Sequence, residues 1–322
     1  MTSMTERLVA CPICAGGVFK TLPTPGHWAG TQVFGRYRAQ FQVVRCRRCG
    51  FVFTNPRPAG PLLDEYYAGV TYEFSTAFWR EKSAKNVLDH LATFCRPAES
   101  RLLDFGCGAG YFLETARQRG WKAPAGFEVG QLAIQTCQQK GLEVTGSVAW
   151  LKGQGGFEVI TLNHVLEHVA DTGGLFVLLR DLLRPGGHIY VEVPNVASLR
   201  ARLSLPFCSR WLGFDERYRA FPSHLCYFTK STLTRCLELH GFKPLSITTA
   251  GLGIEELFFR TDEGPRASND FAQGTINKER SPVGVDGATG RGLSRRFKDL
   301  VKGTFKALGI GENLMAVAVR GG

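Results

Sequence analysis

Four cysteines near the amino terminus form two close pairs. Cys11 and Cys14 stand in CPIC, and Cys46 and Cys49 stand in CRRC. A gap of two residues lets both sulfurs of a pair reach one ion from a tight turn, and two such turns complete a tetrahedral site. The pattern leaves no coordination position open for a reacting molecule. The sequence therefore predicts a structural zinc ion, and the alternative is four unrelated buried cysteines.

A glycine-rich turn, DFGCGAG, occupies residues 104–110. The acid Asp104 is followed there by three glycines, Gly106, Gly108 and Gly110. Glycines at the end of a strand let a ligand approach the backbone closely. The turn departs from the dinucleotide fingerprint, because Tyr111 stands where that motif has its third glycine. A phosphate-binding loop is also excluded, because no Gly-Lys-Ser/Thr follows.

A second acid, Glu128, follows the next predicted strand. A carboxylate at that place can accept hydrogen bonds from two ribose hydroxyls. Asp104 and Glu128 together make the predicted crevice rich in acids. They favour a positively charged nucleoside without phosphate groups as the ligand.

The elements that position these residues alternate along the chain. Short apolar runs predict seven strands, one contained in 123–130 and the others at 101–106, 142–146, 157–165, 188–195, 244–250 and 313–320. Helical spacing predicts helices at 111–120, 131–141 and 231–242, and a further helix that begins at 175 and is followed by the Pro-Gly-Gly turn 185–187. Strands that alternate with helices form a parallel sheet covered on both faces. The expected fold class is α/β, with a doubly wound, mostly parallel sheet.

Composition changes divide the chain into five regions. Residues 1–58 read as a small β-rich zinc-binding module, because short apolar pieces alternate there with Gly, Pro and charged residues. Residues 59–98 read as a helical connector, and 99–260 as the ligand-binding α/β domain. Residues 261–292 are rich in glycine and poor in apolar residues, which predicts a flexible insertion. Residues 293–322 supply the final helix and strand.

Hydropathy, cysteine content and net charge restrict the location and the partners of the protein. No apolar stretch is long enough for a membrane span, and MTSMTERLVA is not typical of a secretory signal, so we expect no integral membrane association. The ten cysteines are mostly scattered, which favours a reduced, cytoplasmic protein. The net charge of +11 is compatible with nucleic acid, an anionic membrane or a phosphorylated substrate. Charge alone does not favour nucleic acid.

Several motifs together resemble the class I S-adenosylmethionine-dependent methyltransferases. The matching segments, in order, are LLDFGCGAG, GFEVG, FEVITLNHVLEHV and LLRPGGHIYVEVPN. The resemblance implies a Rossmann-like fold and S-adenosylmethionine as the cofactor. The residues that it implies for the cofactor are Asp104, Gly106, Gly108 and Gly110 at the methionine part, Glu128 at the ribose, and Asn163 near the methyl group. Many members place a carboxylate after the third strand to meet the adenine, and here Ser147 or backbone groups would serve.

The four-cysteine module in front of such a domain is similar to bacterial sugar and natural-product methyltransferases. That resemblance implies a small-molecule acceptor. The adjacent Tyr66 and Tyr67 are expected to face the substrate or to form a structural helix face. Methyl transfer to a hydroxyl or an acidic carbon also requires a group that removes a proton, and histidine suits this role near neutral pH.

His224 and His168 follow the fifth and fourth predicted strands, whose carboxyl ends border the ligand crevice. His224 is our first candidate for the base and His168 the second, and packing roles are the alternatives. In the sugar C-methyltransferases the segment matching FPSHLCYFT carries a tyrosine and a His-Glu-His run. Here Phe221 and Ser223 replace the tyrosine and the acid. We therefore favour methylation of a hydroxyl over methylation of carbon.

Other functions fit parts of the pattern. An RNA methyltransferase would suit the zinc module and the basic charge, but no Asn/Asp-Pro-Pro-Tyr loop follows the fourth predicted strand. Methylation of carbon or nitrogen on a sugar nucleotide stays open. A non-catalytic scaffold is a further alternative, and the intact glycine turn with Glu128 argues against it. The sequence does not indicate an oligomeric state.

Overall fold

A computed structural model describes residues 3–23, 31–68, 77–199, 201, 220–250 and 308–321. The predicted insertion 261–292 and all but the last two residues of the predicted helix 293–309 lie outside these ranges. The described residues form one large mixed sheet, a smaller antiparallel sheet and a two-stranded ribbon.

The large sheet has seven strands in the order β12-β13-β10-β9-β6-β7-β8. Their bounds are β6 Arg101–Phe105, β7 Lys122–Phe127, β8 Glu143–Thr145, β9 Phe157–Asn163, β10 Leu183–Pro194, β12 Phe242–Ala250 and β13 Asn313–Arg320. All neighbours pair in parallel except β13, which is antiparallel to both β10 and β12. The order reverses between β6 and β9, so the carboxyl ends of these strands mark the position of the predicted crevice, where open α/β sheets bind ligands. The predicted Rossmann-like, doubly wound fold class is confirmed.

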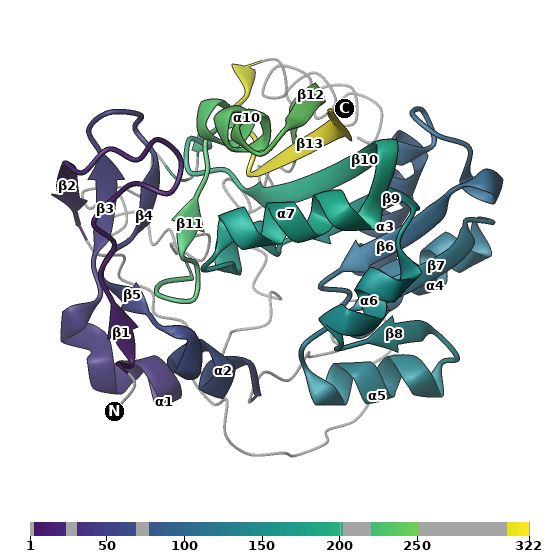
Figure 1. Cartoon of the computed structure of the whole chain (residues 1–322), viewed down its shortest axis with the longest axis horizontal. Helices are drawn as coiled ribbons and strands as arrows, with labels where there is room; N and C mark the ends of the chain where they lie inside the picture. The colour runs from purple at the N-terminus through teal and green to yellow at the C-terminus, as the bar shows by residue number, and fades with distance from the viewer. Residues whose placement is uncertain are drawn as a thin grey trace, which may run out of the picture.

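Helices cover both faces of this sheet, as Figure 1 shows. The helices α3 (Ala77–Leu91), α4 (Tyr111–Gln118) and α5 (Gln131–Gln139) share a buried cluster with Leu102 and Val159. The helices α6 (Val148–Gln154), α7 (Thr172–Leu182) and α10 (Lys230–Leu239) share another with Leu103 and Ile160. Successive residues of β6 and β9 therefore point to opposite faces, which explains why these strands read as continuous apolar runs.

One predicted boundary was misplaced. The predicted helix that starts at Leu175 is α7, which begins earlier, at Thr172, and ends at Leu182, before the predicted Pro-Gly-Gly turn. Asp171 caps its start by accepting a hydrogen bond from the backbone N–H of Gly174 at 2.9 Å. Pro185 and the two glycines after it do not continue the helix and instead form an irregular stretch of β10. The short helix α6 was not predicted, because its seven residues carry only one buried side chain, Leu151.

The amino-terminal region is a β-rich module with its own aromatic core. Its antiparallel sheet contains β2 (Phe19–Leu22), β3 (Val43–Cys46) and β4 (Val52–Thr54). The strands β1 (Thr5–Glu6) and β5 (Arg57–Pro58) form the ribbon, and α1 (Thr31–Phe34), a 3-10 helix (Gly35–Gln40) and α2 (Gly60–Ala68) complete the region. Four fully buried rings fill the core, those of Phe34, Phe41, Phe51 and Phe53.

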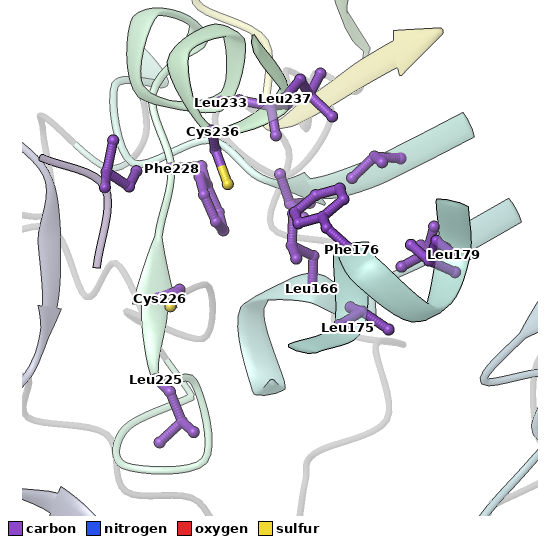
Figure 2. Close-up of a cluster of buried hydrophobic side chains, with 14 of the residues drawn as sticks. Leu166, Leu175, Phe176, Leu179, Leu225, Cys226, Phe228, Leu233, Cys236 and Leu237 are labelled. Carbon is purple, nitrogen blue, oxygen red and sulfur yellow. The ribbon is translucent and has the colours of Figure 1, made fainter. Parts of the chain in front are cut away.

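A strand from the predicted α/β domain completes the module's sheet. The strand β11 (Cys226–Tyr227) pairs antiparallel with β4, so Cys226 lies opposite Phe53. Figure 2 draws Cys226, Phe228 and Phe176 of α7 in one close-up, and all three belong to one buried cluster. The predicted regions 1–58 and 99–260 therefore share both a sheet and a core.

The described residues contain neither a membrane-spanning helix nor a disulfide. None of the described helices combines the length and the apolar character that a bilayer crossing requires. The nine described cysteines are all unpaired, and Cys208 lies outside the described residues.

Candidate functional site

The four predicted metal ligands lie together. The Sγ atoms of Cys11 and Cys49 are 3.6 Å apart, those of Cys14 and Cys46 are 3.5 Å apart, and all four lie within 4.8 Å of one another. Four sulfurs bound to one zinc ion at about 2.3 Å stand about 3.8 Å from each other in a tetrahedron. The donor set and its spacing therefore fit zinc.

Two tight turns build this cluster. The backbone N–H of Ala15 donates to the carbonyl of Cys11 at 2.9 Å, and that of Gly50 donates to the carbonyl of Cys46 at 3.0 Å. Burial opposes ionisation of Cys46, but backbone N–H groups of Cys49 and Arg48 stabilise its thiolate and lower its pKa to about 7. A thiolate, rather than a thiol, is the form that binds a metal.

The glycine turn connects β6 to α4. Its glycines have left-handed φ values of 81° at Gly106, 53° at Gly108 and 83° at Gly110. A Cβ at Gly106 would lie 2.5 Å from Val165, and one at Gly110 would lie 2.4 Å from Leu142. Gly110 thus lets the start of α4 pack closely on its neighbours, whereas Gly106 and Gly108 shape the turn at the crevice.

Asp104 is a buried acid at the carboxyl end of β6. Its Oδ1 accepts hydrogen bonds from the hydroxyl of Thr161 at 2.6 Å and the amide of Asn163 at 3.1 Å. Burial raises its pKa to about 6, against these two hydrogen bonds and with help from the charge of Glu128. A nearby cation would therefore favour its ionised form.

Glu128 lies at the end of β7 and joins the glycine turn. Its Oε2 accepts from the backbone N–H of Gly108 at 2.9 Å, and its Oε1 accepts from those of Val129 and Gly130 at 2.8 and 2.9 Å. The side chain is 3% exposed. A carboxylate oxygen has more than one acceptor direction, so both oxygens can still accept hydroxyl hydrogens.

The remaining predicted cofactor residues lie at two places. Asn163 ends β9 and contacts Asp104, so it belongs to the same group of polar side chains. Ser147 begins α6, and its hydroxyl accepts a hydrogen bond from the backbone N–H of Trp150 at 3.2 Å. The structure therefore gives Ser147 a capping role at the far end of the sheet.

The two candidate bases lie in contact. The rings of His168 and His224 are perpendicular, with centroids 4.6 Å apart. His168 ends the 3-10 helix Leu166–His168 after β9, and His224 precedes β11. The ring of Tyr67 in α2 is 6.2 Å from that of His168. Residues from three separate segments thus meet at one end of the crevice.

Sequence reasoning missed three residues of this group. Glu167, 1% exposed, has a ligand atom within 4.8 Å of those of His168 and His224. His164 adopts a left-handed φ of 54° and places its ring between Glu167 and Glu192. Thr54 of β4 donates a hydrogen bond from its hydroxyl to the carbonyl of His224 at 3.0 Å. The acid directly before His168 was a visible signal for Glu167, and no local signal marks Thr54.

Comparison with known proteins gives a family. The family model described as "Methyltransferase domain" matches residues 77–247. This stretch begins with α3 and reaches into β12. It contains the glycine turn, both buried acids and both candidate histidines.

Two similar proteins are each named ubiquinone biosynthesis O-methyltransferase. The one from Caulobacter vibrioides is 30% identical over 155 residues, which cover 42% of this chain and 58% of that protein. The one from Saccharophagus degradans is 30% identical over 107 residues, which cover 30% of this chain and 45% of that protein. The chain spans about half the length of these relatives.

Solved structures are similar at low identity. A SAM dependent methyltransferase from Archaeoglobus fulgidus is 18% identical, with 75% of this chain and 94% of that chain covered and a TM-score of 0.46.

Proposed function

On the premise that the chain belongs to the methyltransferase-domain family, we propose that it transfers a methyl group from S-adenosylmethionine to a hydroxyl of a small molecule. The observation that carries the proposal is the pair of buried acids, Asp104 and Glu128, on either side of the glycine turn. Two buried carboxylates beside a glycine turn suit a cationic nucleoside.

In this proposal, different residues of the crevice bind different parts of the cofactor. Glu128 accepts hydrogen bonds from the ribose hydroxyls, and Asp104 attracts the positively charged methionine end. Gly106 and Gly108 allow the cofactor to lie against the backbone, and Asn163 borders the methyl group. Bound S-adenosylmethionine supplies a methyl group that is already activated by its sulfonium. The protein therefore needs to align the acceptor and remove its proton.

The imidazoles of His168 and His224 remove that proton. His168 lies five residues beyond Asn163, the last residue of β9, and its ring is near those of His224 and Tyr67. Oxygen is favoured as the methylated atom by the names of the relatives and by the absence of a His-Glu-His run in FPSHLCYFT. The acceptors to be tested first are sugars, sugar nucleotides, phenols and other natural products.

The four-cysteine cluster holds a structural zinc ion in this proposal. All four sulfurs are needed to complete the tetrahedron, so the ion has no place for an acceptor. We place the protein in the cytoplasm, because the described cysteines are unpaired and zinc thiolates persist under reducing conditions.

Asp104→Asn is expected to weaken cofactor binding and to stabilise the free protein above pH 6. The pKa of Asp104 is raised from 3.8 to about 6, so its contribution to stability is lost as the pH rises through this interval. Asparagine avoids that loss, which is worth up to about 3 kcal/mol. Urea unfolding at pH 4 and pH 7.5 tests this expectation, with Asp181→Asn on the exposed side of α7 as the control. A stability difference that does not grow with pH would contradict it.

Glu128→Gln is expected to weaken S-adenosylmethionine binding about tenfold to a hundredfold, the scale for a charged hydrogen-bonding partner. Glutamine has nearly the same shape but loses the charge and one of the two acceptor oxygens. Calorimetric titration measures the effect, and Glu143→Gln on the exposed side of β8 is the matched control. Equal affinities of the Glu128 variant and the wild type would remove Glu128 from the ribose site.

The proposal as a whole is tested by titrating purified protein with S-adenosylmethionine while zinc is assayed on the same sample. Micromolar binding with one zinc per chain, followed by methylation of a hydroxyl compound, is the expected result. A folded, zinc-loaded protein that binds no cofactor with or without acceptors would refute the proposal in favour of a scaffold.

A further inference from the structure

Glu167 is a buried acid among histidines. Its side chain is 1% exposed, and within the described residues neither of its carboxylate oxygens has a hydrogen-bond partner. The other buried glutamate nearby, Glu192, differs in this respect. It accepts hydrogen bonds from the hydroxyl of Tyr190 and the amide of Asn313, both at 2.8 Å. A buried carboxylate without hydrogen bonds is costly unless positive charge compensates it.

Three imidazoles are positioned to supply that charge. His164 places its Nδ1 3.4 Å from Oε1 of Glu167. His168 and His224 place a ring nitrogen within 4.8 Å of a carboxylate oxygen. From this geometry we propose that Glu167 is a positioning residue, whose carboxylate stabilises the imidazolium formed when His168 or His224 takes the acceptor's proton. The inference rests on the proposed function, because the proton comes from the methylated hydroxyl.

Electrostatics keep Glu167 charged despite its burial. Burial alone would raise the pKa of Glu167, but His164, His168 and His224 hold it below its usual value. His164 is clamped on its other side by Glu192, whose Oε1 lies 3.6 Å from Nε2. Partial burial opposes the charge on His164, but the two carboxylates raise its pKa well above the usual range. His164 is therefore protonated at neutral pH and does not serve as the base.

The contact made by Nδ1 of His168 identifies which of its two ring nitrogens can accept a proton. Nδ1 lies 3.1 Å from the backbone carbonyl of Ser223. A carbonyl only accepts hydrogen bonds, so Nδ1 carries the hydrogen and Nε2 has the free electron pair. A histidine oriented in this way by a third group has the arrangement of an activated base.

The step balances without any further reactant. The acceptor's O–H bond breaks, its proton moves to the imidazole nitrogen, and the oxygen electrons form the bond to the methyl carbon. The carbon–sulfur bond breaks with its electron pair staying on sulfur. The sulfonium charge disappears and an imidazolium appears beside the carboxylate of Glu167. Positive charge therefore moves toward the buried carboxylate during the reaction. A carboxylate that is already in place there stabilises the developing imidazolium.

Other charged or titratable groups face this cluster. They are Tyr66 and Tyr67 from α2, Arg57 from β5, Glu192 from β10, and Cys226 and Tyr227 from β11. Arg57 is engaged with Glu6 at 2.7 Å and with the carbonyl of Ala170 at 2.9 Å. Glu167 is thus the one carboxylate among the described groups that faces both candidate bases.

The test compares the wild type with Glu167→Gln in the full-length, zinc-loaded protein. Histidine NMR titration reads each imidazole without acceptor or cofactor. We expect the titration midpoints of both His168 and His224 to fall by about one pH unit or more when the carboxylate is removed. The control Glu192→Gln should move His164 alone, and His240, which stacks on Phe176 at 4.7 Å, should move in neither variant.

A second readout uses the pH dependence of the reaction once an acceptor is known. The acid limb of kcat/KM should shift to lower pH in Glu167→Gln, with an unchanged affinity for S-adenosylmethionine. Unchanged midpoints of His168 and His224 would overturn the role of Glu167, whatever the outcome of the methylation assays. A second zinc equivalent that binds the wild type and is lost in Glu167→Gln would also overturn it, because the acid would then be a metal ligand.

Discussion

Cys46→Ser is expected to remove zinc from the protein and to unfold the amino-terminal module. Cys46 is buried at the end of β3, and its Sγ lies 3.5 Å from that of Cys14. Structural zinc in a four-ligand site stabilises its fold by on the order of 10 kcal/mol, more than the few aromatic side chains of this module supply. Zinc assay, limited proteolysis and circular dichroism measure the effect.

Cys95→Ser provides the matched control. Cys95 is a half-buried thiol that donates to the carbonyl of Leu91 and lies outside the cluster. Its variant should keep one zinc per chain and a protease-resistant module. If Cys46→Ser also kept its zinc and its module, the four cysteines would be buried side chains without a metal role.

The loss of zinc is expected to disturb the candidate base His224 as well. The strand β4 begins three residues after Cys49, and its Thr54 holds the carbonyls of both His224 and Leu225, the latter through its backbone N–H at 2.9 Å. The glycine turn and Glu128 follow β6 and β7, and within the described residues no hydrogen bond joins them to the module. Zinc-free protein should therefore retain affinity for S-adenosylmethionine while it loses turnover.

The main sheet could be predicted from the sequence, because most of its strands are apolar runs that are recognisable without knowledge of their partners. Runs such as FEVITLN and HIYVEVP are long, apolar and bounded by turns, so their order along the chain indicates the sheet. The strand β11 has only two residues and pairs with a strand far away in the sequence. No periodicity is visible in two residues, so the shared sheet required the three-dimensional structure.

The residues of the candidate site likewise include some that could be predicted from the sequence and some that could not. Asp104, Glu128, His168 and His224 were predicted because each lies near or after the carboxyl end of a predicted strand, and parallel strands bring these ends to one edge. Glu167 was overlooked because charged residues in a loop are usually solvated, whereas this one is enclosed when the segment before β11 folds over it. The backbone N–H of Leu225 donates to the carbonyl of Glu167 at 2.7 Å, and this contact is part of that enclosure.

His224→Gln is expected to lower turnover by a factor of about a hundred to ten thousand, the usual contribution of a general base. Glutamine retains hydrogen-bonding capacity and much of the volume at this 8% exposed position, so the fold should survive. S-adenosylmethionine binding should be unchanged, because Asp104 and Glu128 lie on other strands. Rate measurements at saturating cofactor give the effect, and His240→Gln at the end of α10 is the control.

The comparison with His168→Gln shows which imidazole takes the proton. The two rings are 4.6 Å apart, so one is able to assist the other through its charge or by orienting it. Replacing the ring that accepts the proton should lower turnover by the full factor of about a hundred to ten thousand, and replacing its partner should lower it less. The double variant should lose little more than the more damaging single variant. Such non-additivity is expected of residues that act as a unit. Normal turnover in both single variants would exclude the pair from proton removal and leave alignment of the acceptor as the sole contribution of this end of the crevice.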